Sequence, residues 1–502
     1  MIPFSTNNSN AQLSLFEDDF GAKLNKDNRW IKLASELPWE KLCSIYRRRM
    51  NPRRGAPSID ARIVIGALII KHKLCLSDVA TIEMIQENVY LQYFLGFSCF
   101  NVNPIFDPSL FVYIRRRLGV SEFDEMTLLL MDADEKRNGE NDNSDNNCLK
   151  SDGHITHKGN LKIDATVADA EVRYPTDIDL LNDVRKKSET LIRILYHAAE
   201  TKLPRMYCRS ARRSYLNIIK RRQKNKELIR QGIKDQLQFI RRNMGYINTI
   251  LDQDDTLLEL LKSSDLKYLY VIQHVFFQQE KMYNDQVYTH PNRIISIHQP
   301  HVRAILRGKA KNRIEFGAKI GVSIDRSYAR IDTLSWDAYN ESADLKKQVI
   351  AYMIYHGYYP MEVLADKIYL TRDNRKWLKE RGIKIIGAPL GRPSAEMKTA
   401  IQKDELRKAM GRRNEVEGMF GLAKRIYKLN NIRAKLKQTA ESWIAAGYFV
   451  INVMRFLRGS LCALLLFIEN ATKIVIVIQK IFNIAILREY FTTRRMPYRI
   501  HQ

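Results

Sequence analysis

The sequence is poor in cysteine and lacks any cysteine pattern. Its six cysteines are scattered, and none forms a Cys-x-x-Cys pair or a zinc-finger spacing. Two close histidine pairs, His154/His157 and His298/His301, have no matching second pair of ligands. This argues against a disulfide framework and against a zinc site. We therefore expect reduced, mostly buried thiols and a cytoplasmic protein.

The sequence also lacks a long, uninterrupted apolar run. Its N-terminus has no charged region followed by an apolar stretch, so no signal peptide is expected. Polar and charged residues interrupt the most apolar stretch, 461–487, whose longest clean run is eight residues. A membrane-spanning helix needs about 20 apolar residues. We expect this stretch to form a buried or partner-facing helix.

Acidic residues are scarce relative to basic ones. The 502 residues include 56 Asp and Glu against 82 Lys and Arg, a formal net charge of +26. Such an excess indicates a polyanionic partner, with nucleic acid favoured over an acidic membrane surface. From Lys202 to Arg242 the sequence has 14 basic residues and two acidic ones, whereas a solvated helical face normally mixes signs. We expect a phosphate-binding surface here, with the candidate contacts Arg212, Arg213, Lys220, Arg221, Arg222 and Lys224.

Patterning divides the chain into five segments. The first contains short helices with basic ends, typical of a helix-turn-helix-like DNA-binding bundle, although any small helical bundle is the alternative. The expected segments are an N-terminal helical domain at 1–133, a polar linker at 134–160, a mixed α/β core at 161–177 and 290–460, a basic helical insertion at 178–289, and a C-terminal helical tail at 461–502.

Two aspartates occupy strand positions in the α/β core. Alternation over 161–172 predicts a strand in which Asp164 faces away from Leu161 and Ile163. A lone Asp within a strand is disfavoured, and a metal ion would compensate it. Asp366 follows the predicted strand 361–365, at the strand end where open α/β sheets place ligands. The element order predicts a mixed α/β sheet with a helical insertion after its first strand.

A third carboxylate lies on a predicted helix. Arg413, Glu417 and Lys424 fall at about 0°, 40° and 20° around a helical axis, which forms one stripe. Taken alone this is a solvated stripe with i,i+4 pairing. Together with Asp164 and Asp366 it suits Mg²⁺, or Mn²⁺, beside a phosphate. Two such ions promote an in-line phosphoryl displacement, the chemistry of phosphodiester cleavage.

Four other carboxylates are weaker candidates. Glu415 is expected to point about 160° away from Arg413 and to be solvated. Asp177 is interpreted as a possible helix cap. Asp169 and Asp325 lie close to the core without a specific pattern.

Several sequence blocks resemble one protein family. They are Gln12–Glu17, Arg54–Ser58, Tyr90–Gly96, Lys162–Val167, Tyr174–Asp177, Ser296–His301, Glu315–Lys319, Leu364–Tyr369 and Arg413–Lys424. These blocks resemble bacterial insertion-sequence transposases of the DDE class, in the group named for insertion sequences five and eleven-eighty-two. The resemblance implies an RNase H-like catalytic core. It departs from the family at Met410, where the pattern often has Tyr, so a Tyr contact to DNA is not expected.

The resemblance assigns roles to the candidate residues. Asp164, Asp366 and Glu417 would be the catalytic triad that holds two Mg²⁺ or Mn²⁺ ions, with Arg413 and Lys424 on DNA phosphates. The implied function is a transposase that binds the terminal inverted repeats of its element, cleaves there and joins the 3′-hydroxyl to target DNA. It also implies a homodimer on the DNA in the bacterial nucleoid.

Three other functions remain open at this point. A structure-specific nuclease of the same fold would use the same carboxylates without strand transfer. A catalytically inactive relic would keep only DNA binding. A membrane-surface protein would use its basic helices alone.

Overall fold

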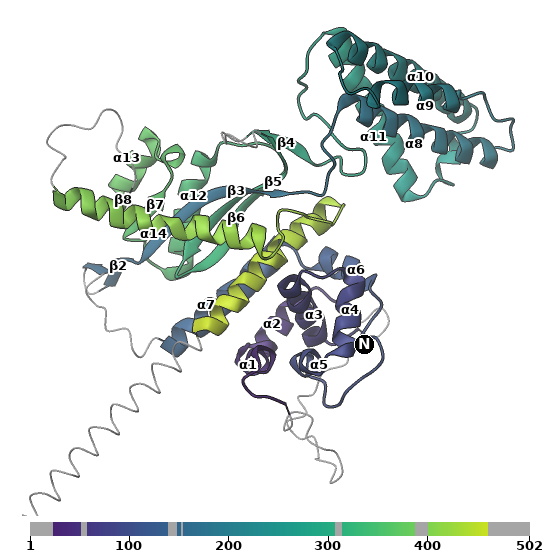
Figure 1. Cartoon of the computed structure of the whole chain (residues 1–502). Coiled ribbons are helices and arrows are strands. Elements are labelled where there is room, and N and C mark those ends of the chain that lie inside the picture. Colours follow the sequence, from purple (N-terminus) through teal and green to yellow (C-terminus); the bar gives the residue numbers. More distant parts are fainter. Residues whose placement is uncertain are drawn as a thin grey trace, which may run out of the picture. The chain divides into compact units, whose positions relative to one another are not determined.

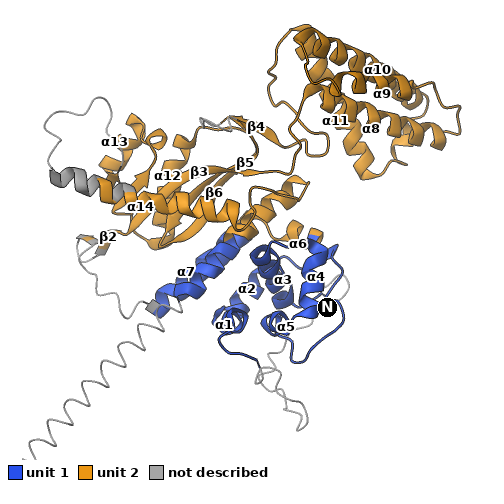
Figure 2. Cartoon of the chain, in the orientation of Figure 1, with its two compact units in different colours: residues 1–111, 121–147, 449–502 blue, residues 112–120, 148–448 orange. Residues whose placement is uncertain are grey.

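A computed structural model describes residues 24–51, 58–138, 148–151, 154–306, 314–386 and 400–459. The chain forms two compact units (Figure 2). Unit 1 comprises residues 1–111, 121–147 and 449–502, and unit 2 comprises 112–120 and 148–448. The expected tail at 461–502, including the apolar stretch 461–487, lies outside the described residues. Within the described residues, no helix is long and apolar enough to cross a bilayer.

The described residues of unit 1 form helices. Asp60 accepts a hydrogen bond from the Arg62 backbone N–H, and Ser77 accepts one from Ala80, so both side chains cap helices. Aromatic packing contributes to its core, since Trp30 and Trp39 each pack against Phe94 with ring centres 5.1 Å apart. The helices are α1 Arg29–Glu36, α2 Trp39–Arg47, α3 Ala61–Leu74, α4 Asp78–Glu87, α5 Val89–Leu95 and α7 Val120–Asn138, and α6 Leu110–Arg117 crosses the unit boundary.

Two of the three consecutive arginines at 47–49 pair with acidic residues. Arg48 pairs with Glu125, and Arg49 pairs with the buried Glu122, both on α7. These two arginines therefore stabilise the packing of unit 1 and are less available to an external phosphate.

Unit 2 is built on a mixed sheet (Figure 1). β5 pairs with β3 on one edge and with β4 and β6 on the other, all antiparallel, while β7 and β8 continue beyond β3 in parallel. Arg326 and Ser327 have positive φ in the tight turn between β5 and β6, where the sequence predicts a turn. The strands are β3 Asn160–Asp169, β4 Arg303–Leu306, β5 Ile314–Asp325, β6 Tyr328–Ser335, β7 Glu362–Ala365 and β8 Lys384–Ile386.

The alternation of β3 gives the sheet two different faces. Leu161 and Ile163 are buried in a core with Leu345 and Val349 of α12 (Asp344–His356) and with Leu378 of α13 (Arg372–Glu380). The residues between them project to the other face. There Lys162 pairs with Glu415 of α14 (Ala400–Arg425). The helix α14 therefore lies on the face from which Asp164 projects.

The segment after β3 is a helical stack. It consists of α8 Asp177–Ala198, α9 Cys208–Ile219, α10 Lys226–Gln253 and α11 Ser263–Asn284, and it has its own core of leucine, isoleucine and valine side chains. The chain returns from this stack to the sheet at β4. The mixed α/β character of unit 2 agrees with the predicted fold class, and the helical stack lies between β3 and β4 in the chain.

The range 134–160 contains more regular structure than a linker. α7 continues to Asn138, and a hairpin of β1 (Cys148–Ser151) and β2 (His154–Lys158) precedes β3. Lys158 donates its backbone N–H to the carbonyl of Tyr359, so the hairpin joins unit 2 through backbone hydrogen bonds. The polar composition of this range did not indicate a hairpin, because backbone hydrogen bonds stabilise it and burial of apolar side chains does not.

Candidate catalytic site

Strand register brings Asp164 and Asp366 to neighbouring positions. β3 and β7 pair in parallel, and their last matched residues are Ile163 and Ala365. The next residue on each chain is Asp164 and Asp366. Adjacent strands are about 4.8 Å apart, and matched positions face the same side of a sheet. Asp164 and Asp366, which are 202 positions apart in the chain, therefore lie side by side at the C-terminal end of β7.

Asp164 is half-buried, and its ionisation reflects this. Burial, together with the negative charges of Asp366 and Glu341, raises its pKa to about 6. The Ala165 N–H, which donates to Oδ1 at 2.8 Å, and the Arg413 guanidinium act in the opposite direction. A bound cation would favour the ionised carboxylate in the same way as Arg413 does.

Arg413 joins the second and third predicted acids. Its Nη1 lies 3.1 Å from Asp366 Oδ1, and its Nη2 lies 3.0 Å from Glu417 Oε1. One guanidinium therefore bridges a residue after β7 and a residue on α14. The Asp366 and Glu417 side chains are 55% and 59% exposed, whereas Arg413 is 22% exposed. The cluster is consequently anchored at Asp164 and open to solvent at the other two acids.

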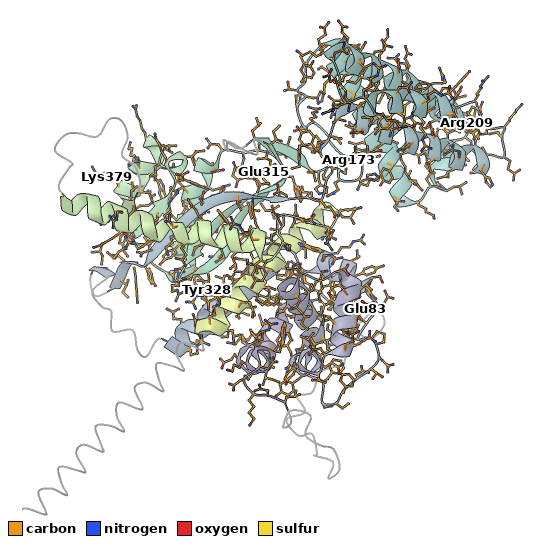
Figure 3. The ribbon with its side chains drawn as sticks, in the orientation of Figure 1. Glu83, Arg173, Arg209, Glu315, Tyr328 and Lys379 are labelled. Carbon is orange, nitrogen blue, oxygen red and sulfur yellow. The ribbon has the colours of Figure 1, made fainter. Side chains whose placement is uncertain are left out.

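Lys424 lies apart from this cluster. Its Nζ is 3.8 Å from Glu315 Oε1 on β5, a residue labelled in Figure 3. Eleven residues separate Lys424 from Arg413, which corresponds to about 16 Å along a helix. The two cations of the predicted stripe therefore have different partners. Arg413 pairs with Asp366 and Glu417, whereas Lys424 pairs with Glu315 on β5.

No described group of three acids, histidines or cysteines is close enough to hold a metal ion. The guanidinium of Arg413 lies between Asp366 and Glu417, where a shared ion would have to lie. The chemistry of the donors nevertheless fits a hard divalent cation, because all three are carboxylates and two of them are adjacent in register.

The structure adds one acid that sequence reasoning did not single out. Glu341 begins the short helix η3 (Glu341–Ala343), lies 2.9 Å from Lys319 Nζ, and raises the pKa of Asp164 through its charge. Its sequence context looked like an ordinary helix start, so no local signal marked it. The effect of Glu341 on the pKa of Asp164 depends on the folded structure, which brings the two residues close enough to interact.

The expectation that Glu415 is solvated is wrong. Its carboxylate accepts a hydrogen bond from Lys162 Nζ on β3, 253 residues away in sequence. Glu415 was expected to be solvated because it points away from Arg413 around the helix axis. That side of α14 also contacts the sheet, where Lys162 pairs with Glu415.

The other competing carboxylates have structural partners. Asp177 accepts from Gln279 and from Arg293, while Thr176 is the residue that caps α8. Asp325 accepts from His356 Nε2 at 2.7 Å, and both side chains are buried.

The predicted basic surface is exposed. All six candidate contacts are solvent-exposed, and none forms an ion pair with a described residue; they are Arg212, Arg213, Lys220, Arg221, Arg222 and Lys224. Arg209, which lies on α9 together with Arg212 and Arg213, is also exposed and is labelled in Figure 3. Unneutralised cations of this density are available to a polyanion.

Two family models match the chain in separate places. Residues 363–454 match the family described as transposase DDE domain, and residues 18–117 match the family described as transposase domain DUF772. The first match includes Asp366, Arg413, Glu417 and Lys424, but it does not reach Asp164. Two separate segments of the chain are thus similar to transposase domains, in agreement with the resemblance predicted from its sequence.

One curated relative is the protein named ORF8 in the nfe locus of Rhizobium meliloti. It is 29% identical over 125 residues, a match that covers 25% of this chain and 60% of the relative. No solved structure matches the chain.

Proposed function

We propose that the protein binds the terminal inverted repeats of its insertion sequence, cleaves the DNA ends by two-metal phosphodiester hydrolysis, and joins the freed 3′-hydroxyl to target DNA. The observation that carries this proposal is the cluster of Asp164, Asp366 and Glu417 around one arginine. It supports an RNase H-like core in which these acids are the catalytic triad.

In this proposal the three acids would hold two Mg²⁺ or Mn²⁺ ions. Such ions activate the attacking nucleophile and stabilise the leaving oxygen. Arg413 pairs with Asp366 and with Glu417, and it would release these carboxylates when they hold an ion instead. Its guanidinium is then available to bind phosphate oxygens of the DNA, the partner that suits its planar, bidentate geometry.

The DNA would be held by cations outside the cluster. The exposed residues Arg212, Arg213, Lys220, Arg221, Arg222 and Lys224 would track the phosphate backbone, and Lys424 would contact it along α14. The helices of unit 1 and the stack α8–α11 would provide end recognition. By resemblance, the active form is a homodimer on two DNA ends in the bacterial nucleoid.

The central test is Glu417→Gln, which removes one metal-binding charge at an exposed position. We expect this variant to bind DNA flanking its own gene as wild type does, but to nick it at least about 100-fold more slowly with Mg²⁺. Glu415→Gln is the matched control, since Glu415 lies on the same helix and pairs with Lys162. Equal nicking by Glu417→Gln and wild type would remove Glu417 from the site.

A joining assay distinguishes transposition from nuclease action. Purified protein with Mg²⁺ is expected to join a precut end to a plasmid, whereas a structure-specific nuclease would cut without joining. A catalytically inactive relic would bind the ends, and Asp164→Asn would then change nothing in a cleavage assay.

A further inference from the structure

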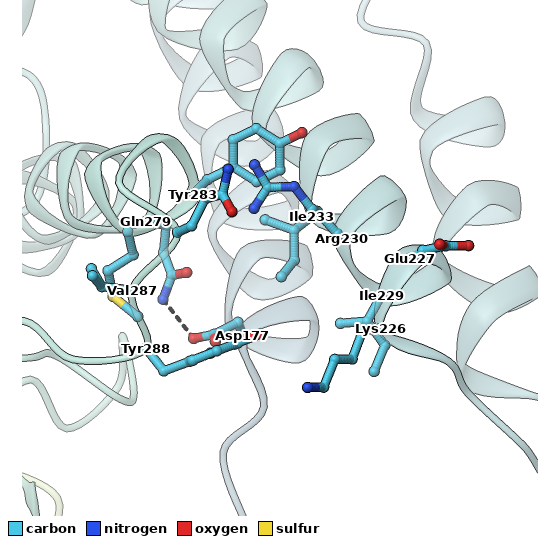
Figure 4. A pocket seen from close by; sticks show the side chains of 12 residues that line it. Asp177, Lys226, Glu227, Ile229, Arg230, Ile233, Gln279, Tyr283, Val287 and Tyr288 are labelled. Carbon is cyan, nitrogen blue, oxygen red and sulfur yellow. Dashed lines mark hydrogen bonds between the residues drawn. The ribbon is translucent and has the colours of Figure 1, made fainter.

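The stack α8–α11 contains a cavity outside the carboxylate cluster. It lies between the N-terminal half of α10 and the C-terminal end of α11, with Asp177 of α8 at its inner side (Figure 4). Its volume is about 480 Å³, within the range of small-ligand sites. Apolar side chains form much of its wall, namely Ile229, Ile233, Met282 and Val287.

Planar and cationic groups line the same cavity. The Arg230 guanidinium lies over the Tyr283 ring, with its central carbon 4.2 Å from the ring centre. Lys226 is exposed and forms no ion pair with a described residue. The negative charge of Asp177 is offset, because Arg293 Nη2 donates to its Oδ1 at 2.5 Å and Gln279 donates at 2.8 Å. Glu227 lies on the rim, and its carboxylate points away from Asp177 (Figure 4).

The cavity is continuous with the basic surface. Lys226 begins α10, and it follows directly after the exposed cations Lys220 to Lys224 and the capping residue Asn225. A DNA strand held by those cations would come close to Lys226, which lines the cavity. The matching ligand has a flat, mostly apolar group joined to a phosphate, which is the chemistry of a nucleotide.

We propose that this cavity binds one unstacked nucleobase of the DNA. The base would stack on Tyr283 or on the guanidinium of Arg230, above the apolar wall, with its phosphate on Lys226. This inference rests on the proposed function, since it requires DNA on the basic surface. It assigns to the helical stack a site for single-stranded DNA in addition to backbone binding.

The experiment compares two labelled duplexes by fluorescence anisotropy, using the full chain. One carries a short single-stranded 3′ overhang with bases, and the other carries the same overhang made of abasic sites. Both have the same phosphates, so backbone binding affects them equally. Wild type is expected to bind the base-containing overhang at least about fivefold more tightly.

Variants at Tyr283 test the assignment. Tyr283→Ala is expected to lose the preference and to bind both overhangs as wild type binds the abasic one, whereas Tyr283→Phe keeps the ring and the preference. Tyr270→Ala is the matched control, because Tyr270 lies on the same helix, is 64% exposed and contacts His274 outside the cavity. Lys226→Ala is expected to weaken binding of both overhangs by similar factors.

The outcomes separate this inference from the proposed function. If wild type binds both overhangs equally well, the proposal that the protein binds DNA is unaffected, and the inference that the cavity binds a base is wrong. If Tyr283→Ala weakens both overhangs equally, the ring has only a structural role and the inference is wrong. If wild type binds no DNA at all, the proposed function fails together with this site.

Discussion

Asp164 is a half-buried carboxylate that is partly desolvated in the folded protein. Its raised pKa means that the charged form is less favourable in the folded protein than in the unfolded chain. As pH rises from about 4 to about 6, the folded protein keeps a proton that the unfolded chain has released. This group therefore lowers the stability of the protein as pH rises through that window, and the loss is complete above it.

Asp164→Asn is consequently expected to stabilise the protein at pH 7.5, by about 1–3 kcal/mol, while abolishing cleavage. Thermal unfolding at several pH values checks this, and the gain should fade as the pH falls from about 6 to 4. Added Mg²⁺ should raise the unfolding temperature of wild type and not that of the variant. A variant as stable as wild type at every pH would show that burial of Asp164 has no energetic cost.

Arg413 neutralises the two exposed acids when no metal is bound. Arg413→Met is expected to bind Mn²⁺ about two- to thirtyfold more tightly without DNA, because exposed ion pairs contribute about 0.2–1 kcal/mol each and Arg413 forms two of them. Titration calorimetry measures this directly. Arg412→Met is the control, since Arg412 pairs with Glu362 instead. Weaker Mn²⁺ binding by Arg413→Met would mean that Arg413 orders the acids and does not compete with the metal.

At the scale of elements, α14 contains three glycines whose surroundings are open. A Cβ added at Gly411, Gly418 or Gly421 would meet no described atom within 4 Å. Each glycine costs a helix about 1 kcal/mol relative to alanine. Packing within the chain therefore does not require them, and close approach of a DNA backbone is one physical reason for their presence.

Gly418→Ala is expected to stabilise the protein by about 1 kcal/mol and to weaken DNA binding, because Gly418 follows Glu417 at the proposed site. Calorimetric unfolding and an electrophoretic shift measure the two effects. Gly447→Ala serves as a contrast, since its Cβ would lie 2.5 Å from Leu429 and should destabilise the fold. Unchanged DNA affinity in Gly418→Ala would indicate that no backbone approaches this turn of α14.

At the scale of the whole molecule, charge is the property that sets DNA affinity. The chain has a net charge of +26, and the cations after α9 are exposed together without ion-pair partners among the described residues. Each phosphate contact lowers the slope of log K against log salt by about 0.9 for duplex DNA. The salt dependence of binding therefore counts these contacts.

Replacing Arg221, Arg222 and Lys224 with Gln is expected to reduce that slope by up to about 2.7, with weaker binding to every DNA sequence. Anisotropy titrations over a range of salt concentrations measure the change. Arg241→Gln is the control, because Arg241 is exposed on the same stack but pairs with Glu280. An unchanged slope in the triple variant would place the DNA on another surface.

The sequence by itself determined the elements and their faces. Alternation placed Asp164 opposite Leu161 and Ile163, and the predicted strand 361–365 agrees with β7 within one residue. It also predicted that Arg413 and Glu417 share one side of α14. These results follow from local periodicity, which depends only on neighbours in the chain.

Only the tertiary structure decided which charges meet. The packing of α14 on the sheet pairs Glu415 with Lys162 and Lys424 with Glu315, and the β3–β7 register sets Asp366 beside Asp164. A helical angle states which side of α14 a residue occupies, but not what lies opposite that side. Contacts between residues that are hundreds of positions apart depend on how the layers pack, and no local pattern encodes that arrangement.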